Sequence, residues 1–193
     1  TTASLCGLGH ALEADDPKEI DLALQRILLI HGVIFTIGGI PLIYLGDEIG
    51  MLNDPSYRDD FEKEDDARWL HRPAFDWEKA EARTDPESVE GRLHNGFLKL
   101  NQMRINNDAL AKGETEIVNT GNDHVFGYFR TTHDQTVLCL ANFSDSPQVV
   151  AAPRLRQLGL RRALIDIVAG QTVLASKKIE LSPLQFVVLL KRG

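Results

Sequence analysis

Gly39-Ile40-Pro41-Leu42-Ile43-Tyr44-Leu45-Gly46-Asp47-Glu48-Ile49-Gly50 is the stretch of the sequence that decides the fold. Its first half, residues 40–45, is a continuous apolar run of strand length, which is typical of a strand that is covered on both faces. The glycine pair Gly38-Gly39 precedes it and ends the periodic segment upstream. A helix, a tight turn and a buried strand in this order favour an α/β architecture.

Two amphipathic helices are predicted on either side of this strand. Residues 17–37 carry apolar side chains at helical spacing, and Pro17 stands at a first-turn position. Residues 86–105 show the same period and are followed by the stop signal Asn106-Asn107. The first 105 residues therefore encode two helices but only one confident strand.

A single buried strand cannot form a parallel sheet alone, because each parallel strand needs neighbours beside it. We therefore expect the chain to be the C-terminal part of a larger protein, whose other strands precede Thr1. The alternatives are a swapped dimer and an unusual small α/β domain.

Beyond the second helix the apolar period drops from about 3.6 to two, as expected for strands. The pattern predicts an antiparallel sandwich of seven short strands, with polar turns between them. These strands are centred on residues 116–118, 125–129, 137–143, 149–150, 163–167, 178–181 and 186–190. The chain thus divides near residues 107–113, into a first part of residues 1–110 and a sandwich domain of residues 111–193.

Composition narrows the function further. The chain has 21 basic and 28 acidic residues, for a formal net charge of −7, and its basic runs are no longer than two residues. We therefore expect neither nucleic acid nor a membrane as a partner. The longest apolar stretch is broken by glycine, proline and histidine, and no signal peptide is visible. The expected location is cytoplasmic or, because the start of the parent protein is not seen, unknown. Cys6 and Cys139 are predicted to be buried thiols, with one long-range disulfide as the alternative.

The chemistry-bearing residues are carboxylates and arginines, since no GxSxG, phosphate loop, HExxH or zinc-spaced Cys and His pair occurs. Asp47-Glu48 follow the predicted strand at the edge where α/β folds bind ligands, but adjacent residues diverge too much to form a glycosidase pair. Arg68 lies in an acidic and aromatic run, residues 64–73. Such an arginine presents its planar guanidinium to a carboxylate or to sugar hydroxyls, or belongs to a solvated charged loop. Trp69 and Trp77 favour an ordered loop within residues 51–85.

The stretch from Gly39 to Gly50 fits the pattern GxPxxYxGxExG and resembles the last barrel strand of the α-amylase superfamily, glycoside hydrolase family 13. Gln102-Met103-Arg104 and Leu140-Ala141-Asn142-Phe143-Ser144 are similar to the closing helix and the C-terminal domain of that family. Residues 45–54 followed by residues 65–73 resemble amylosucrases and the related bacterial sucrose hydrolases.

This resemblance implies the C-terminal segment of a TIM (β/α)8 barrel, with its last helices and eighth strand, followed by an antiparallel Greek-key β-sandwich. It implies a sucrose-splitting, retaining enzyme that passes glucose to an α-glucan or to water. We expect no metal and no cofactor. The three catalytic carboxylates of the family would precede Thr1, so no catalytic residue is assigned here. Arg68 is the one implied substrate-binding residue, whereas Asp47, Glu48 and Trp69 are expected to be structural. The implied partners are sucrose, α-glucan and the N-terminal part of the same barrel.

Two rival interpretations remain open at this stage. The sandwich could be a non-catalytic carbohydrate-binding or interaction module, although its few aromatic side chains are mostly assigned to the core by the alternating pattern. The other rival is a different specificity within the same family, such as a sucrose phosphorylase, a trehalulose-forming enzyme or an α-1,4-glucosidase. Only residues 65–73 separate these specificities.

We predict that the 193-residue chain alone does not split sucrose, because the implied carboxylates lie outside it. Fructose release by the purified chain, free of any upstream fragment, measures this directly. Release above the buffer background would contradict the prediction.

Overall fold

The computed structural model describes residues 1–191. The chain divides into two compact units, one formed by Thr1–Leu28 and Leu42–Leu98 and the other by Leu29–Pro41 and Lys99–Gly193. The boundaries fall inside the long helices α3 (Pro17–Thr36) and α5 (Val89–Ile105), so both helices contribute residues to both units. Both helices were predicted, and the structure confirms them.

The first unit is built from helices and 3-10 turns. The short helices α1 and α2, which the sequence pattern did not predict, precede α3, and the long loop after residue 50 contains several short helical turns. Their bounds are α1 Thr2–Leu5, α2 Leu8–Glu13, η1 Asp47–Ile49, η2 Pro55–Asp59, η3 Ala67–His71, α4 Trp77–Glu81 and η4 Ala82–Thr84.

The predicted strand at residues 40–45 is wrong for this chain, since no strand is assigned between α3 and η1. Its side chains are largely in solvent: Ile40 is 95% exposed, Leu42 84% and Leu45 66%. The physical reason is the absence of parallel neighbours, which the described residues do not supply; all strand pairs in them are antiparallel and lie after residue 113. The predicted barrel segment is therefore not formed here as a sheet.

The end of α3 is held by two arginine side chains. Arg104 donates to the carbonyl oxygens of Phe35 at 2.7 Å and of Gly39 at 2.6 Å. Arg130 donates to the carbonyl of Ile37 at 3.2 Å. Cations are favourable at a helix C-terminus, where the last carbonyls lack intrahelical partners. The chain then turns at Gly38 and Gly39, which have φ angles of 124° and 65°.

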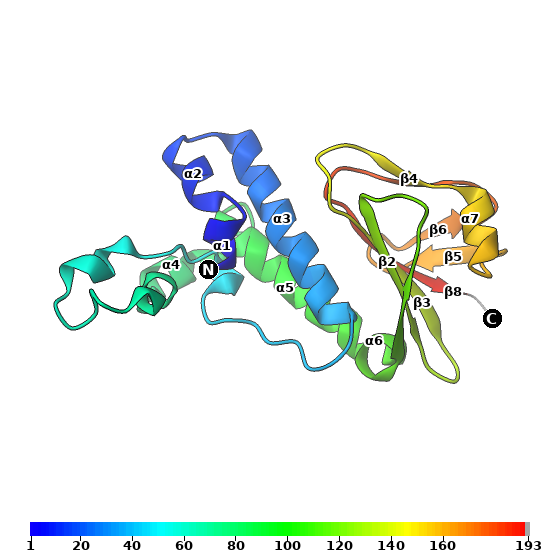
Figure 1. The fold of residues 1–193 in the computed structure, drawn as a ribbon, viewed down its shortest axis with the longest axis horizontal. Coiled ribbons are helices and arrows are strands. Elements are labelled where there is room, and N and C mark those ends of the chain that lie inside the picture. The colour runs from blue at the N-terminus through cyan, green and yellow to red at the C-terminus, as the bar shows by residue number, and fades with distance from the viewer. Residues whose placement is uncertain (192–193) are drawn as a thin grey trace. The chain divides into compact units, whose positions relative to one another are not determined.

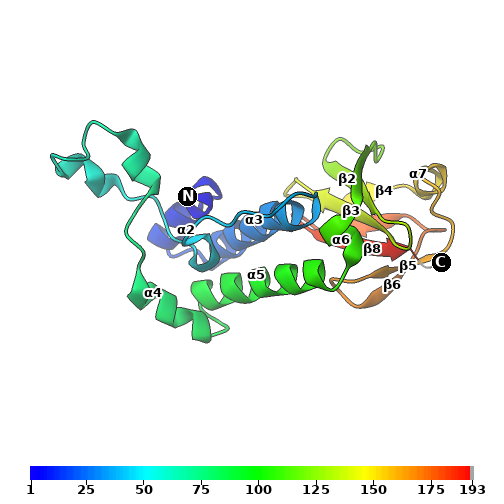
Figure 2. The same ribbon diagram turned by 90° about the horizontal axis from the view of Figure 1, so that it is seen from below.

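The second unit contains an antiparallel sandwich (Figures 1 and 2). Six strands form one sheet in the order β1-β2-β3-β8-β5-β6, and β4 pairs with β7 in a second sheet. The bounds are β1 Glu114–Val118, β2 Val125–Thr131, β3 Thr136–Asn142, β4 Gln148–Val150, β5 Ala163–Asp166, β6 Gln171–Leu174, β7 Ile179–Leu181 and β8 Phe186–Lys191. The predicted sandwich is confirmed, with β6 and the helices α6 (Asp108–Lys112) and α7 (Ala152–Gln157) as elements that the pattern missed.

The six-stranded sheet buries apolar side chains on both faces. One face packs against the β4–β7 pair and α7 around Leu140, Leu155 and Leu181. The other face, around Tyr128 and Val188, packs against α6 and partly buried side chains that include Val33 of α3. The sandwich core therefore extends upstream of residue 111.

We predict that Leu164→Ala in β5 lowers the free energy of unfolding by about 2–5 kcal/mol, because the side chain is 1% exposed and leaves a cavity. Leu174→Ala in the neighbouring strand β6 is the matched control: that side chain is 46% exposed, and we expect a loss below about 1 kcal/mol. Thermal and denaturant unfolding of both variants tests the pair. Equal losses would contradict the assigned core.

Candidate functional site

The loop that carries Arg68 fixes this side chain by a local carboxylate. Asp66 caps η3 and accepts a hydrogen bond from the backbone amide of Arg68 at 3.0 Å. The same carboxylate accepts from Arg68 Nε at 2.8 Å and from Arg68 Nη2 at 2.8 Å. This bidentate geometry orients the planar guanidinium.

The electrostatics of this pair agree with its geometry. Hydrogen bonds from the Arg68 side chain and backbone lower the pKa of Asp66 to about 2, and the Asp66 carboxylate raises the pKa of Arg68. The Arg68 side chain is nevertheless 69% exposed, so the guanidinium is held through Nε and Nη2 while most of the side chain remains open to solvent. The pair is a surface contact, and its importance lies in orientation rather than in stability.

The surrounding loop is ordered by its own contacts. The backbone amide of Asp54 donates to the carbonyl of Leu70 at 2.8 Å, which ties the two ends of the loop segment together. Lys63 pairs with Asp60 at 2.5 Å and lies 5.4 Å from the centre of the Trp69 ring. Trp69 is half-buried and supports the loop, as expected.

The large apolar surface of Trp77 favours its burial within an ordered loop, but the side chain is 75% exposed. It makes an edge-to-face contact with Phe75, at 4.8 Å between ring centres. Burying an indole requires a surrounding core, and the described residues around this part of the loop supply one partner ring only.

The predicted acidic pair at residues 47–48 faces the backbone. Asp47 accepts from the amide of Thr2 at 3.2 Å and from its hydroxyl at 3.0 Å. Glu48 accepts from the amide of Gly46 at 2.9 Å. These bonds brace the turn and join α1 to it. The contacts thus suit the structural role expected for both residues.

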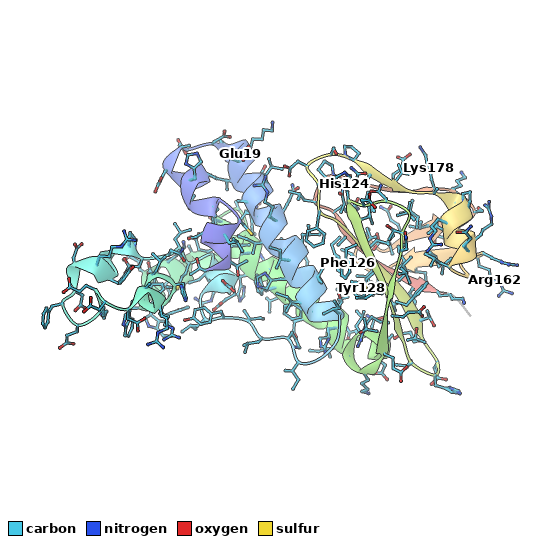
Figure 3. All side chains as sticks on the ribbon, viewed as in Figure 1. Glu19, His124, Phe126, Tyr128, Arg162 and Lys178 are labelled. Carbon is cyan, nitrogen blue, oxygen red and sulfur yellow. The ribbon has the colours of Figure 1, made fainter. Side chains whose placement is uncertain are left out.

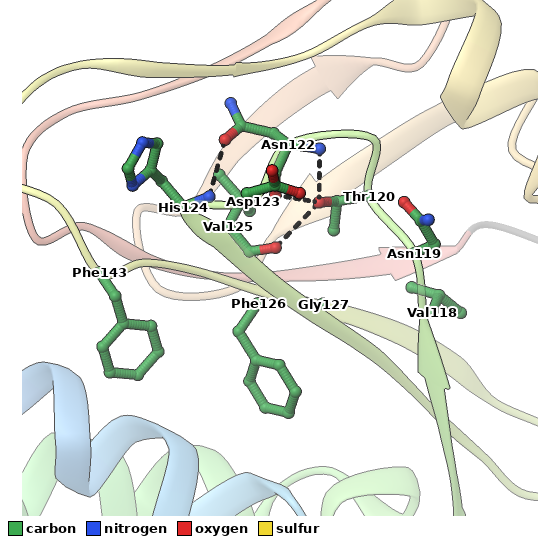
Figure 4. A pocket seen from close by; sticks show the side chains of 10 residues that line it. All are labelled: Val118, Asn119, Thr120, Asn122, Asp123, His124, Val125, Phe126, Gly127 and Phe143. Atoms are coloured by element: carbon green, nitrogen blue, oxygen red, sulfur yellow. Dashed lines mark hydrogen bonds between the residues drawn. The ribbon is translucent and has the colours of Figure 1, made fainter.

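The sandwich contains a groove of about 300 Å³ that the sequence pattern did not predict (Figure 4). Polar side chains of the β1–β2 turn and two phenylalanine rings line it. His124 directly precedes β2, and Phe126 and Tyr128 lie within that strand (Figure 3). The sequence pattern indicates only a polar turn here, since exposure of a single aromatic residue leaves no periodic signal. The lining residues are Val118, Asn119, Thr120, Asn122, Asp123, His124, Val125, Phe126, Gly127 and Phe143.

The two cysteines are free and buried, which confirms the thiol interpretation over the disulfide. Burial raises the pKa of the Cys139 thiol to about 12, so it is unreactive at neutral pH. Among residues 1–191, no group of three or more His, Cys, Asp and Glu side chains is placed to hold a metal ion. No helix in the same range has the length and hydropathy needed to cross a membrane.

The sandwich is similar in sequence to a domain of known proteins. Residues 120–190 match the sequence model of the cyclo-malto-dextrinase C-terminal domain. Alpha-amylase 3 of Dictyoglomus thermophilum is 24% identical over 131 residues, which cover 63% of this chain and 26% of that protein. This chain therefore spans about a quarter of the length of that relative.

Solved structures share the fold. AmyP in complex with maltotriose superimposes with a TM-score of 0.67 and 17% identity, over 88% of this chain and 35% of AmyP. MutB in complex with the substrate sucrose gives a TM-score of 0.59 and 20% identity, over 86% of this chain and 38% of MutB. The sandwich is therefore similar in sequence to the cyclo-malto-dextrinase C-terminal domain over residues 120–190, and the solved structures share its fold. They do not confirm the finer amylosucrase assignment.

We predict that Asp66 titrates with a midpoint near pH 2, and that Arg68→Gln raises its pKa toward the ordinary aspartate value. The backbone contribution to the shift remains in the variant, so the rise is partial. Because the folded-state pKa is lowered, the stabilising contribution of the pair is complete above the unfolded-state pKa and is lost as the pH falls through about 2.

Carboxyl-detected NMR titration of the chain measures this midpoint. Arg72→Gln is the matched control, since the charge of Arg72 is the smallest cause of the shift. An unchanged Asp66 midpoint in Arg68→Gln would show that the bidentate pair does not form in solution.

Proposed function

We propose that this chain is the C-terminal part of a sucrose-splitting, retaining glucosyltransferase or hydrolase of the amylosucrase type, in which Arg68 binds substrate. The catalytic carboxylates lie upstream, outside this chain. The observation that carries the proposal is the guanidinium of Arg68, which is oriented by Asp66 yet 69% exposed at the side chain.

The exposed apolar segment at residues 40–45 supports a barrel upstream. Within residues 40–45, every side chain except that of Pro41 is an exposed large apolar one: Ile40, Leu42, Ile43, Tyr44 and Leu45. An apolar run of this kind is stable in water only when strands and helices cover both of its faces. In the proposed protein, upstream strands and helices of a (β/α)8 barrel would cover residues 40–45. These residues would then form a strand, and η1 with Asp47 would follow its carboxyl end.

The sugar chemistry follows from the groups that the loop presents. An arginine held on one side by a carboxylate keeps Nη1 and the outer face of the guanidinium for a second carboxylate or for sugar hydroxyls. In the proposed enzyme, Arg68 positions the glucosyl unit while upstream carboxylates form and break the covalent glucosyl intermediate. The relatives bound to sucrose and to maltotriose support a carbohydrate substrate for this chain as well.

We predict that Arg68→Ala in the intact protein lowers kcat/KM for sucrose by about ten- to a hundredfold, the effect expected from losing a charge-assisted hydrogen bond. Arg58→Ala is the matched control: this arginine lies on the same loop, 5.6 Å from the centre of the Tyr57 ring, and should change kcat/KM little. Fructose release measures the reaction.

Product analysis of the intact protein tests the proposed activity itself. We expect fructose with either free glucose or an elongated α-glucan. Cleavage of maltose or maltodextrin without any action on sucrose would contradict the proposal, as would trehalulose as the main product. A folded Arg68→Ala variant with unchanged kcat/KM would remove Arg68 from the substrate site.

A further inference from the structure

We propose that the groove between the β1–β2 turn and Phe143 is a sugar-binding site, which takes glucosyl units of an α-glucan. The choice of α-glucan as ligand rests on the proposed function. The existence of the site rests on the groove itself, which belongs wholly to the second compact unit.

The turn that forms one wall is rigid before any ligand arrives. Thr120 is 3% exposed, and its hydroxyl donates to the carbonyls of Asn122 at 3.0 Å and Val125 at 2.8 Å. Asn122 accepts from the amide of His124 at 3.0 Å and donates to the Gln148 side chain at 2.9 Å. A preformed wall of this kind lowers the entropy lost on binding.

Other elements of the same sandwich hold this turn in place. Arg154 of α7 donates from Nε to the carbonyl of Asn119 at 2.6 Å. Gly127 lets strand β2 approach Thr120 closely, since a Cβ at position 127 would lie 2.5 Å from Thr120 Cγ2. The amide of Phe143 donates to the carbonyl of His124 at 2.9 Å, which joins the aromatic side of the groove to the polar side.

The aromatic side has the surface that a sugar ring needs. Phe143 is 50% exposed although it directly follows the wholly buried Asn142, and the half-buried Phe126 lies beside it along the groove (Figure 4). A pyranose ring has an apolar C–H face and polar edges, so it stacks on an aromatic ring and directs its hydroxyls to nearby polar groups. Asp123 and His124 are exposed at the groove and can make those hydrogen bonds.

Charge narrows the class of ligand. The groove lining contains no lysine or arginine, and Asp123 is its acidic residue. A phosphorylated sugar or another anion would be repelled by this carboxylate, and no lining Lys or Arg would offset the repulsion. A neutral sugar would experience no such repulsion. The volume of about 300 Å³ is at the small end of ligand pockets, which suits a short stretch of glycan rather than a folded partner.

The test uses the 193-residue chain, labelled with 15N and titrated with maltotriose. We expect amide shifts confined to residues 118–127 and to Phe143, with a dissociation constant on the order of 1 mM. Phe143→Ala should weaken binding about tenfold or more, and Phe143→Trp should retain it. Leu174→Ala is the matched control, because it removes a side chain of similar exposure from the same sandwich, outside the groove.

Cellotriose and glucose 6-phosphate test the ligand class. Weaker binding of both supports the proposal, and equal binding of either overturns its commitment to a neutral α-glucan. Shifts confined to other residues, or no saturable binding of maltotriose, would overturn the site itself. This experiment involves no catalytic carboxylate and no Arg68 contact, so its failure leaves the sucrose proposal standing, and a protein inactive on sucrose can still bind maltotriose here.

Discussion

Two guanidinium groups at the carboxyl end of α3 determine how the second unit is built. Arg130 is 3% exposed, and its pKa is lowered by burial and by the nearby charge of Arg104. A buried cation is stable only where acceptors replace water. Backbone carbonyls do so here, because Arg104 and Arg130 together bind those of Phe35, Ile37, Gly39, Leu110 and Ala111. The helix end, the α6 turn and the sheet are thereby joined through shared hydrogen bonds.

The packing of α3 against the sheet beside these arginines also allows few other side chains. Thr36 donates its hydroxyl to the carbonyl of Gly32 at 2.7 Å and shares a hydrogen bond of 2.5 Å with the Tyr128 hydroxyl. A Cβ on Gly32 would lie 2.7 Å from the Phe186 ring, so only glycine permits this approach of helix and ring. One face of the sandwich is therefore completed by a helix that lies about a hundred residues earlier in the sequence.

Local patterns predicted most of the regular structure. The helices α3 and α5 and the strands of the sheet follow from apolar period, because their burial within this chain decides their conformation. The segment at residues 40–45 has the correct pattern for a buried strand but lacks neighbours here, and strand formation depends on partners that sequence pattern cannot supply. The missed strand β6 has mostly exposed side chains, so no alternation marks it.

The two candidate sites, Arg68 and the groove, also differ in how far the local sequence marks them. Arg68 is a candidate from sequence because an acidic residue two positions away and a distinctive local motif mark it. The groove was missed because its parts come from a turn and from a strand end some twenty residues later, and nothing in the local sequence brings Asn122 and Phe143 together. The size of Trp77 favours an ordered loop, whereas the exposure of its side chain depends on which surfaces surround it.

The pairing of Arg68 with Asp66 explains why an arginine suits this position better than a lysine. The carboxylate accepts from Nε and Nη2, so the orientation of the guanidinium is fixed within the loop, and in the proposed substrate-binding role Nη1 would donate to a new acceptor without breaking the existing pair. A lysine carries its donors on one nitrogen and would have to divide them between Asp66 and the substrate in a less defined geometry. Because Asp66 already orders the Arg68 side chain, less conformational entropy would be lost when the guanidinium contacts a sugar or a second carboxylate. The net binding free energy would be more favourable for that reason.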